Sequence, residues 1–172
     1  MRLAGKVAVI TGAAAGIDGQ LMGFGGAAAR LFAREGAKVV LTDIKEALGV
    51  QTAERIRSQG GEALFVRHDV TSEEEWQEVI QTTVATFGRL NVLVNNAGTG
   101  ARFTVEETTV EVWDGQMDVH AKGVFLGTKY AIPEMRKAGG GSIINRRFSR
   151  CEIDSHSSPS TSPFFKECGR FV

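Results

Sequence analysis

The architecture of this 172-residue chain follows from one stretch near its N-terminus, Val7-Ala8-Val9-Ile10-Thr11-Gly12-Ala13-Ala14-Ala15-Gly16-Ile17. Its first four residues are a short apolar run typical of a buried β-strand, and Thr11-Gly12 ends the run. The glycines that follow allow backbone amides to approach a phosphate, which the N-terminus of a following helix also attracts. The stretch therefore predicts a strand, a phosphate-binding turn and a helix. An ordinary strand-to-helix loop is the alternative.

The same alternation of apolar runs and helical spacing continues to residue 145. The other strands are expected at Lys38–Thr42, Ala63–Val66, Leu90–Val94 and Ser142–Ile144, and the helices at Ala27–Glu35, Glu46–Gln59, Ser72–Phe87 and about Glu107–Lys137. Strands separated by helices of this length form right-handed βαβ units, in which helices cover both faces of a parallel sheet. We therefore predict an α/β fold with a Rossmann-type sheet of about five strands.

Residues 146–172 do not continue this pattern. Five serines and two of the three prolines fall within residues 155–163, and neither a helical nor a strand period is present. This composition is typical of an irregular tail. We therefore divide the chain into a Rossmann-type domain at residues 1–145 and a tail at 146–172. A basic, aromatic docking segment is the alternative for the tail.

Charge and cysteine content narrow the class of protein. Lys plus Arg and Asp plus Glu both number 20, so the chain has no overall charge that would attract nucleic acid or an anionic membrane. No apolar run approaches the roughly 20 residues that span a bilayer. The two cysteines, Cys151 and Cys168, do not share metal-ligand spacing with the three histidines. We expect a cytoplasmic protein without a metal site.

Asp43 strengthens the prediction of nucleotide binding. It ends the second predicted strand, where a carboxylate can accept hydrogen bonds from ribose hydroxyls. Its alternative role is to cap a helix that starts near Ile44–Glu46. Taken together with the glycine turn, Asp43 favours a nucleotide site.

Four stretches of the chain resemble the short-chain dehydrogenase/reductase family. They are Thr11–Gly16, the strand end Val40-Leu41-Thr42-Asp43, His68-Asp69-Val70, and Asn95-Asn96-Ala97-Gly98. The resemblance covers residues 1–145. It implies a Rossmann-type fold, a nicotinamide cofactor, and hydride transfer between that cofactor and an alcohol or ketone.

The resemblance also implies roles for individual residues. The cofactor would be held by Gly12, Gly16, Ile17, Gly25, Asp43, Asp69, Val70, Asn95, Ala97 and Gly98. Asp69 and Val70 would flank the adenine, and the Asn95–Gly98 segment would line the cofactor and brace the sheet. The charge of Asp43 would repel a 2′-phosphate, so NAD is favoured over NADP. The alternative for Asn95 and Asn96 is a pair of turn residues that satisfy backbone groups.

The glycine motif departs from the family pattern. Asp18 stands where the family has a glycine, and removing residues 18–24 joins Ile17 to Gly25 and restores the pattern. We therefore predict a seven-residue insertion in the phosphate loop. It would push the following helix away from the pyrophosphate or bulge around it, and in either case weaken NAD binding.

The catalytic part of the pattern is not found. The family places a serine after the fifth strand, followed by a tyrosine with a lysine four residues later. Here the single tyrosine is Tyr130, which we expect in the core, and Glu134 stands four residues after it. His120 occupies the usual position of an asparagine that holds a water in the proton relay. A histidine can also bind a water and transfer protons, although a buried, fully hydrogen-bonded side chain is the alternative.

Two functions remain open at this point. The chain is either an NAD-dependent oxidoreductase or a truncated, non-catalytic nucleotide-binding protein that pairs with a full-length homologue. The helix expected at 107–137 commonly packs between subunits in the family. Val119, Val124, Phe125 and Leu126 are its candidates for exposed apolar surface. We therefore also predict a homo-oligomer or a mixed pair through this helix.

Overall fold

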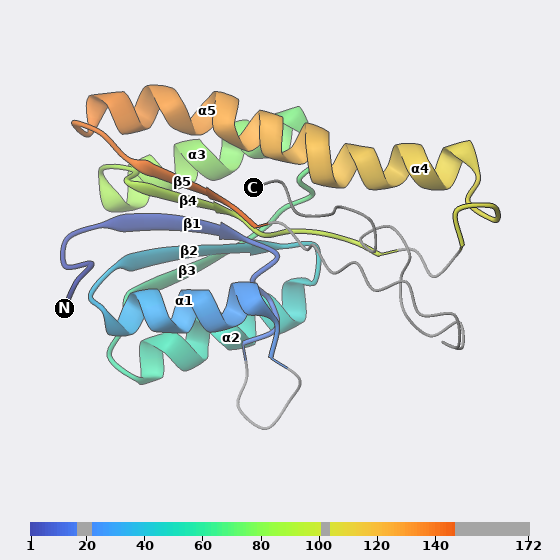
Figure 1. The fold of residues 1–172 in the computed structure, drawn as a ribbon. Coiled ribbons are helices and arrows are strands. Elements are labelled where there is room, and N and C mark those ends of the chain that lie inside the picture. The colour runs from blue at the N-terminus through green and yellow to red at the C-terminus, as the bar shows by residue number, and fades with distance from the viewer. Residues whose placement is uncertain (17–21, 101–103, 147–172) are drawn as a thin grey trace, which may run out of the picture.

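A computed structural model describes residues 1–16, 22–100 and 104–146 of the chain (Figure 1). Its elements are β1 (Val7–Thr11), α1 (Phe24–Arg34), β2 (Lys38–Asp43), α2 (Glu46–Ser58), β3 (Ala63–Arg67), α3 (Glu73–Phe87), β4 (Val92–Asn95), α4 (Val110–Met117), η1 (Asp118–Lys122), α5 (Gly123–Lys137) and β5 (Ser142–Asn145). The predicted α/β fold is confirmed. The tail at 147–172 lies outside the described residues.

The five strands form one parallel sheet in the order β3-β2-β1-β4-β5. From β1 the chain first moves outward to β3 and then returns to the other side of β1 with β4. This reversal of strand order lies at the carboxyl ends of β1 and β4, the position at which open α/β sheets bind their ligands. In the register of these strands, Val9 of β1 lies opposite Val40 of β2 and Leu93 of β4.

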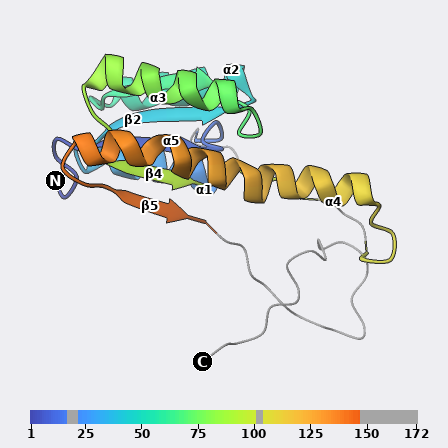
Figure 2. The ribbon, with the colours of Figure 1, turned by 90° about the horizontal axis from the view of Figure 1, so that it is seen from above.

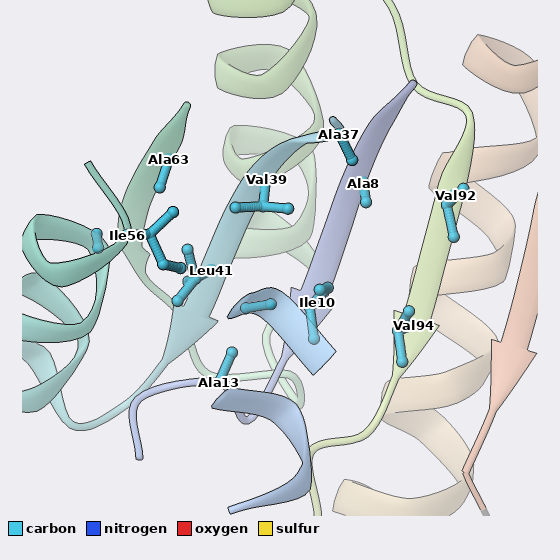
Figure 3. Packing of buried hydrophobic residues seen from close by; sticks show 12 residues of the cluster. Ala8, Ile10, Ala13, Ala37, Val39, Leu41, Ile56, Ala63, Val92 and Val94 are labelled. Atoms are coloured by element: carbon cyan, nitrogen blue, oxygen red, sulfur yellow. The ribbon is translucent and has the colours of Figure 1, made fainter. Parts of the chain in front are cut away.

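Helices cover both faces of the sheet, as Figures 1 and 2 show. On one face, alternate residues of the strands pack against α1 and α2 (Figure 3); the fully buried members include Ala8, Ile10, Val39, Leu41, Ala29 and Ala53. On the other face, the intervening strand residues pack with α3 and α5; the buried members include Val9, Val40, Leu93, Trp76, Val79 and Leu126. The central strands β1, β2 and β4 are buried on both faces and are mostly apolar, as is typical of parallel sheets, whereas the edge strand β5 is largely exposed.

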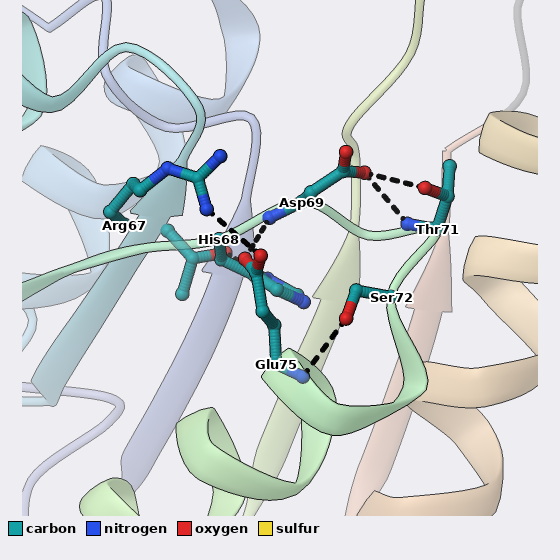
Figure 4. A network of polar contacts seen from close by, with 7 residues as sticks. Arg67, His68, Asp69, Thr71, Ser72 and Glu75 are labelled. Carbon is teal, nitrogen blue, oxygen red and sulfur yellow. Dashed lines mark hydrogen bonds and ion pairs between the residues drawn. The ribbon is translucent and has the colours of Figure 1, made fainter.

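Helix α3 is capped by Ser72, the first residue of the predicted helix. The Ser72 hydroxyl oxygen accepts a hydrogen bond from the Glu75 N–H at 3.2 Å. The Glu75 carboxylate does not return to Ser72, as a complete capping box would require. It accepts hydrogen bonds from the Asp69 N–H at 2.7 Å and from Arg67 at 2.8 Å (Figure 4). Glu75 therefore ties the end of β3 to the start of α3.

The long predicted helix is present but differs in detail. It begins at Val110 rather than Glu107, and the five-residue π-helical segment η1 interrupts it between α4 and α5. Figures 1 and 2 show α4 projecting past the carboxyl ends of the strands. Phe125 is 62% exposed, as predicted, whereas the prediction for Leu126 was wrong because its side chain packs into the sheet.

Tyr130 is not a core residue, contrary to prediction. Its ring is half-buried between α3 and α5. Its hydroxyl donates to Glu73 at 2.5 Å and accepts from Gln77 at 3.0 Å. The polar end of this side chain therefore lies at the outer surface of the helix layer.

Candidate nucleotide-binding site

The glycine turn after β1 is built from close backbone contacts. Gly12 has a φ of +64°, and a Cβ added there would lie 2.8 Å from the Ala97 Cα. A Cβ added at Gly25 would lie 2.3 Å from the Gly12 carbonyl oxygen, and one at Gly16 would lie 2.5 Å from a Thr52 methyl. A side chain at any of these positions would displace its neighbours, which explains why the turn needs glycine.

The helix that follows the predicted insertion lies against the glycine turn. The Gly23 N–H donates to the Ala15 carbonyl at 2.8 Å, and a Cβ added at Gly26 would lie 2.2 Å from the same oxygen. Helix α1 begins at Phe24, three residues before the predicted start, and its first turn touches the glycine turn. Of the two outcomes that we predicted, displacement of the helix is therefore wrong. Ile17 and Asp18 lie outside the described residues.

Asp43 lies beside the glycine turn at the end of β2. One carboxylate oxygen accepts a hydrogen bond from the Ala14 N–H and the other accepts one from the Lys45 N–H, both at 3.0 Å. The alternative role of Asp43 as a helix cap is wrong, because Lys45 is the N-cap of α2 and no side chain caps it. Each carboxylate oxygen retains acceptor capacity for a further donor such as a ribose hydroxyl.

Thr52, which the sequence analysis did not single out, supports the turn from α2. Its buried hydroxyl accepts from the Gly16 N–H at 3.2 Å and donates to the Ala14 carbonyl at 2.5 Å. Thr52 lies 38 residues from Ala14 in the sequence. Only a weak signal in the sequence pointed to this role. Thr52 is a small polar residue on the buried face of α2, which also carries Gly49, Ala53 and Ile56.

The ends of β1 and β4 are joined by two side chains. The Thr11 hydroxyl accepts from the Asn96 N–H at 3.0 Å and the Ala97 N–H at 2.9 Å, and donates to the Val94 carbonyl. The Asn96 side-chain amide donates to the Thr11 and Gly12 carbonyls at 2.8 and 3.1 Å. Asn96 therefore satisfies backbone groups, as the turn alternative described, and holds the glycine turn in place.

Asn95 lies one residue earlier, inside the sheet. It is 5% exposed, and its amide donates to the Asn145 side chain of β5 at 2.8 Å. The oxygen of its side-chain amide finds no hydrogen-bond partner among the residues that the structure describes. A Cβ added at Gly127 would lie 2.8 Å from that oxygen, so the backbone of α5 packs directly against it.

Asp69 and Val70 follow β3, on the side of the site that holds Asp43. Asp69 accepts hydrogen bonds from the Thr71 N–H at 2.9 Å and the Thr71 hydroxyl at 2.8 Å (Figure 4). These hydrogen bonds, the backbone one first, hold the pKa of Asp69 below its ordinary value. Val70 is 8% exposed and packs against the start of α5 at Gly123. The side chain of Asp69 shapes this loop by bonding to it.

His120 lies next to Gly98. A Cβ added at Gly98 would lie 2.7 Å from the His120 Cε1, and the ring Nε2 is 2.8 Å from the Thr99 carbonyl oxygen. The half-buried ring is thus held by the backbone after β4. A role for His120 in a proton relay stays a prediction.

Arg146, which follows β5, reaches the same site and was not singled out from the sequence. Its backbone N–H donates to the Asn95 carbonyl at 2.9 Å, which extends the β4–β5 pairing by one residue. Its guanidinium donates to the side-chain oxygen of Asn96 at 3.1 Å and lies 3.9 Å from the centre of the Phe24 ring.

These residues fit a dinucleotide. The glycine turn would receive a pyrophosphate where α1 begins, since the first N–H groups of a helix have no partners within the helix. Asp43 offers a carboxylate to a ribose on one side of that turn. In the described part of the chain, no cluster of three or more potential metal ligands is found, and no helix is long and apolar enough to cross a bilayer. The sheet order and the helices on both of its faces define a Rossmann-type α/β fold.

Comparison with known proteins specifies the family. A family model described as short chain dehydrogenase matches residues 6–147. This chain belongs to that family, as its sequence motifs implied. Proteins of the family are oxidoreductases that use NAD or NADP.

Three relatives illustrate the match. An uncharacterized oxidoreductase of Thermotoga maritima is 48% identical over 145 residues, which cover 84% of this chain and 54% of the relative. A 2,5-dichloro-2,5-cyclohexadiene-1,4-diol dehydrogenase of Sphingobium indicum is 46% identical, with 84% and 55% covered. A chain from Burkholderia xenovorans, described as a short-chain dehydrogenase/reductase, has a TM-score of 0.76 and 37% identity, with 83% and 56% covered. The chain therefore spans about half the length of the relatives that it matches.

Proposed function

We propose that this chain binds NAD in preference to NADP at the carboxyl ends of β1, β2 and β4. The observation that carries the proposal is the position of Asp43, whose carboxylate bridges the Ala14 and Lys45 N–H groups beside the glycine turn. A ribose hydroxyl would complete the hydrogen bonding of this carboxylate. A 2′-phosphate would meet its negative charge, and residues 13–15 carry no cation to offset that charge.

A thermal melt of the purified chain with each dinucleotide tests this proposal. A ligand at 100 times its dissociation constant stabilises a folded protein by about 2.7 kcal/mol, so NAD raises the midpoint and NADP at the same concentration does not. Asp43→Asn removes the charge but keeps the size, and we expect it to reduce the difference between the two ligands. Equal shifts by NAD and NADP in the unmodified chain would refute the preference.

The predicted insertion gives a second expectation about affinity. Because α1 remains against the glycine turn, any weakening must come from residues of the insertion rather than from a displaced helix. We propose that Asp18 weakens binding through its charge near the pyrophosphate. Removing residues 18–24 should then tighten NAD binding, whereas Asp18→Asn should reproduce part of the gain. Equal affinity with and without the segment would contradict this.

We further propose that these 172 residues bind the dinucleotide without catalysing hydride transfer themselves. The sequence holds one tyrosine, and its hydroxyl bonds to Glu73 and Gln77 on the outer side of α3. No lysine stands four residues after it to lower its pKa for proton exchange.

Oxidation of a cyclic alcohol is the second candidate function. It is favoured by relatives such as the Sphingobium enzyme and a cyclopentanol dehydrogenase of Comamonas testosteroni, the latter 43% identical over 144 residues. Incubating the chain with NAD and cyclopentanol, and following the absorbance of reduced nicotinamide, separates the candidates. Turnover above that of a Gly25→Val variant would overturn the non-catalytic proposal.

We propose that the long helix mediates self-association or pairing with a full-length homologue. Val110, Trp113, Met117 and Phe125 are between 40% and 69% exposed along α4 and α5. Further along α5, a groove between α3 and α5 has a volume of about 520 Å³ and is lined by Ile80, Val84 and Pro133 among others. Exposed apolar surface of this kind favours an interface. Sedimentation of the chain and of Phe125→Glu tests this association, because only the unmodified chain should associate.

We also propose a cytoplasmic location and an irregular tail after the Rossmann-type domain.

A further inference from the structure

Arg146 extends across the carboxyl edge of the sheet. Its backbone pairs with β4 through the Asn95 carbonyl at 2.9 Å. From there the guanidinium reaches the side chain of Asn96, which itself bonds to the end of β1, and then stacks over Phe24, the first residue of α1. One side chain thus connects β5, the end of β4 and the start of α1.

This path crosses one half of the proposed nucleotide site. The adenosine half lies toward β2, where Asp43 would hold the ribose, and the pyrophosphate lies where α1 begins. The second nucleoside must therefore extend from the pyrophosphate in the other direction, toward the ends of β4 and β5. Phe24 and Arg146 face each other from the two sides of that path.

We infer that the contact between Arg146 and Phe24 closes the nicotinamide half of the site, so that this chain binds adenine nucleotides ending in a diphosphate more readily than a complete dinucleotide. The inference rests on the proposed function, since it concerns the same site. ADP needs only the Asp43 side and the glycine turn. NAD must also separate a guanidinium from an aromatic ring and from an amide oxygen, and both contacts oppose its binding.

A competing role for Arg146 is to attract the pyrophosphate by its charge. ADP and NAD both carry a diphosphate, so this role would affect both ligands alike. The ratio of their dissociation constants separates the two roles, because only closure of the nicotinamide half acts on NAD alone.

Isothermal titration of the full chain with ADP and with NAD tests the inference. Arg146→Ala should lower the ratio of the NAD to the ADP dissociation constant by about tenfold, a difference that titration resolves. Phe24→Leu removes the aromatic ring from the other side of the contact and should lower the ratio in the same direction. Arg89→Ala removes a positive charge from an exposed position in the turn before β4, at the opposite edge of the sheet, and should leave the ratio unchanged.

The outcomes distinguish the inference from the proposed function. If ADP and NAD both bind and neither Arg146→Ala nor Phe24→Leu changes the ratio, the inference is wrong and nucleotide binding stands. If Arg146→Ala weakens both ligands equally, the guanidinium serves the diphosphate and the inference is also wrong. If the folded, unmodified chain binds neither ligand, the proposed function fails and the inference fails with it.

Discussion

We predict that the folded chain loses stability in mild acid because of His68, the residue that follows β3. His68 is 1% exposed, its Nδ1 is 3.0 Å from the Thr42 hydroxyl, and its ring meets the Trp76 ring edge-on at 4.4 Å. Its Nε2 finds no hydrogen-bond partner in the described residues. A protonated ring would place a charge and an unpaired N–H in this apolar surrounding.

Burial lowers the pKa of His68 from its usual 6.5 to about 4, although the nearby Glu75 and Asp69 carboxylates act in the opposite direction. The unfolded chain therefore binds a proton near pH 6.5, whereas the folded chain binds it only near pH 4. The contribution of the neutral ring is complete above pH 6.5 and is lost as the pH falls from 6.5 to 4. A difference of this size corresponds to about 3 kcal/mol of unfolding free energy.

Urea unfolding at several pH values between 7 and about 4 measures this loss. His68→Gln can still hydrogen bond to Thr42 but does not titrate, so the difference between the two pH profiles isolates the histidine. In a Trp113→Phe background, Trp76 is the only indole, and its fluorescence reports on the neighbouring ring. Parallel pH profiles for the unmodified chain and His68→Gln would refute the reasoning.

Two further predictions concern the glycine turn. Gly25→Ala should abolish nucleotide binding and cost about 1–3 kcal/mol of stability, because its Cβ would lie 2.3 Å from the Gly12 carbonyl oxygen. The control Gly115→Ala, where an added Cβ meets nothing within 4 Å, should stabilise the chain by about 0.5–1 kcal/mol in a thermal melt. Thr52→Val keeps the volume but removes two hydrogen bonds to the turn, so it should cost about 1–3 kcal/mol and weaken ADP binding in titration. Unchanged stability and affinity in Thr52→Val would show that the turn holds its shape without α2.

The strands could be predicted from the sequence because each is an apolar run bounded by turn residues. The helix starts were less predictable. The apolar spacing suggested a helix from Ala27, but Phe24 already belongs to α1. The residue before Phe24, Gly23, bonds back to Ala15. That contact joins Ala15 to a residue within the predicted insertion, and no local spacing reveals it.

Some residues of the candidate site could likewise be anticipated from the sequence, and others could not. Asp43 and Asn95 could be predicted because they end strands whose carboxyl ends meet at one edge of a parallel sheet. Thr52 could not, since it comes from the buried face of a helix and its role depends on two backbone groups 36 and 38 residues away. Two glutamates at the start of α3 also have partners that local spacing does not reveal. Glu75 accepts a hydrogen bond from the Asp69 N–H, and Glu73 accepts one from the Tyr130 hydroxyl.

The position of Arg146 follows from the sheet rather than from any motif. Asn145 of β5 lies opposite Asn95 of β4, so the next residue must emerge at the ligand-binding edge whatever its side chain. A small residue there would leave the site open toward β5. An arginine is long enough to reach Asn96 and the Phe24 ring at the start of α1. The adenosine half of the site is thus built by the first three strands, whereas access to the other half depends on the residue that follows the fifth strand.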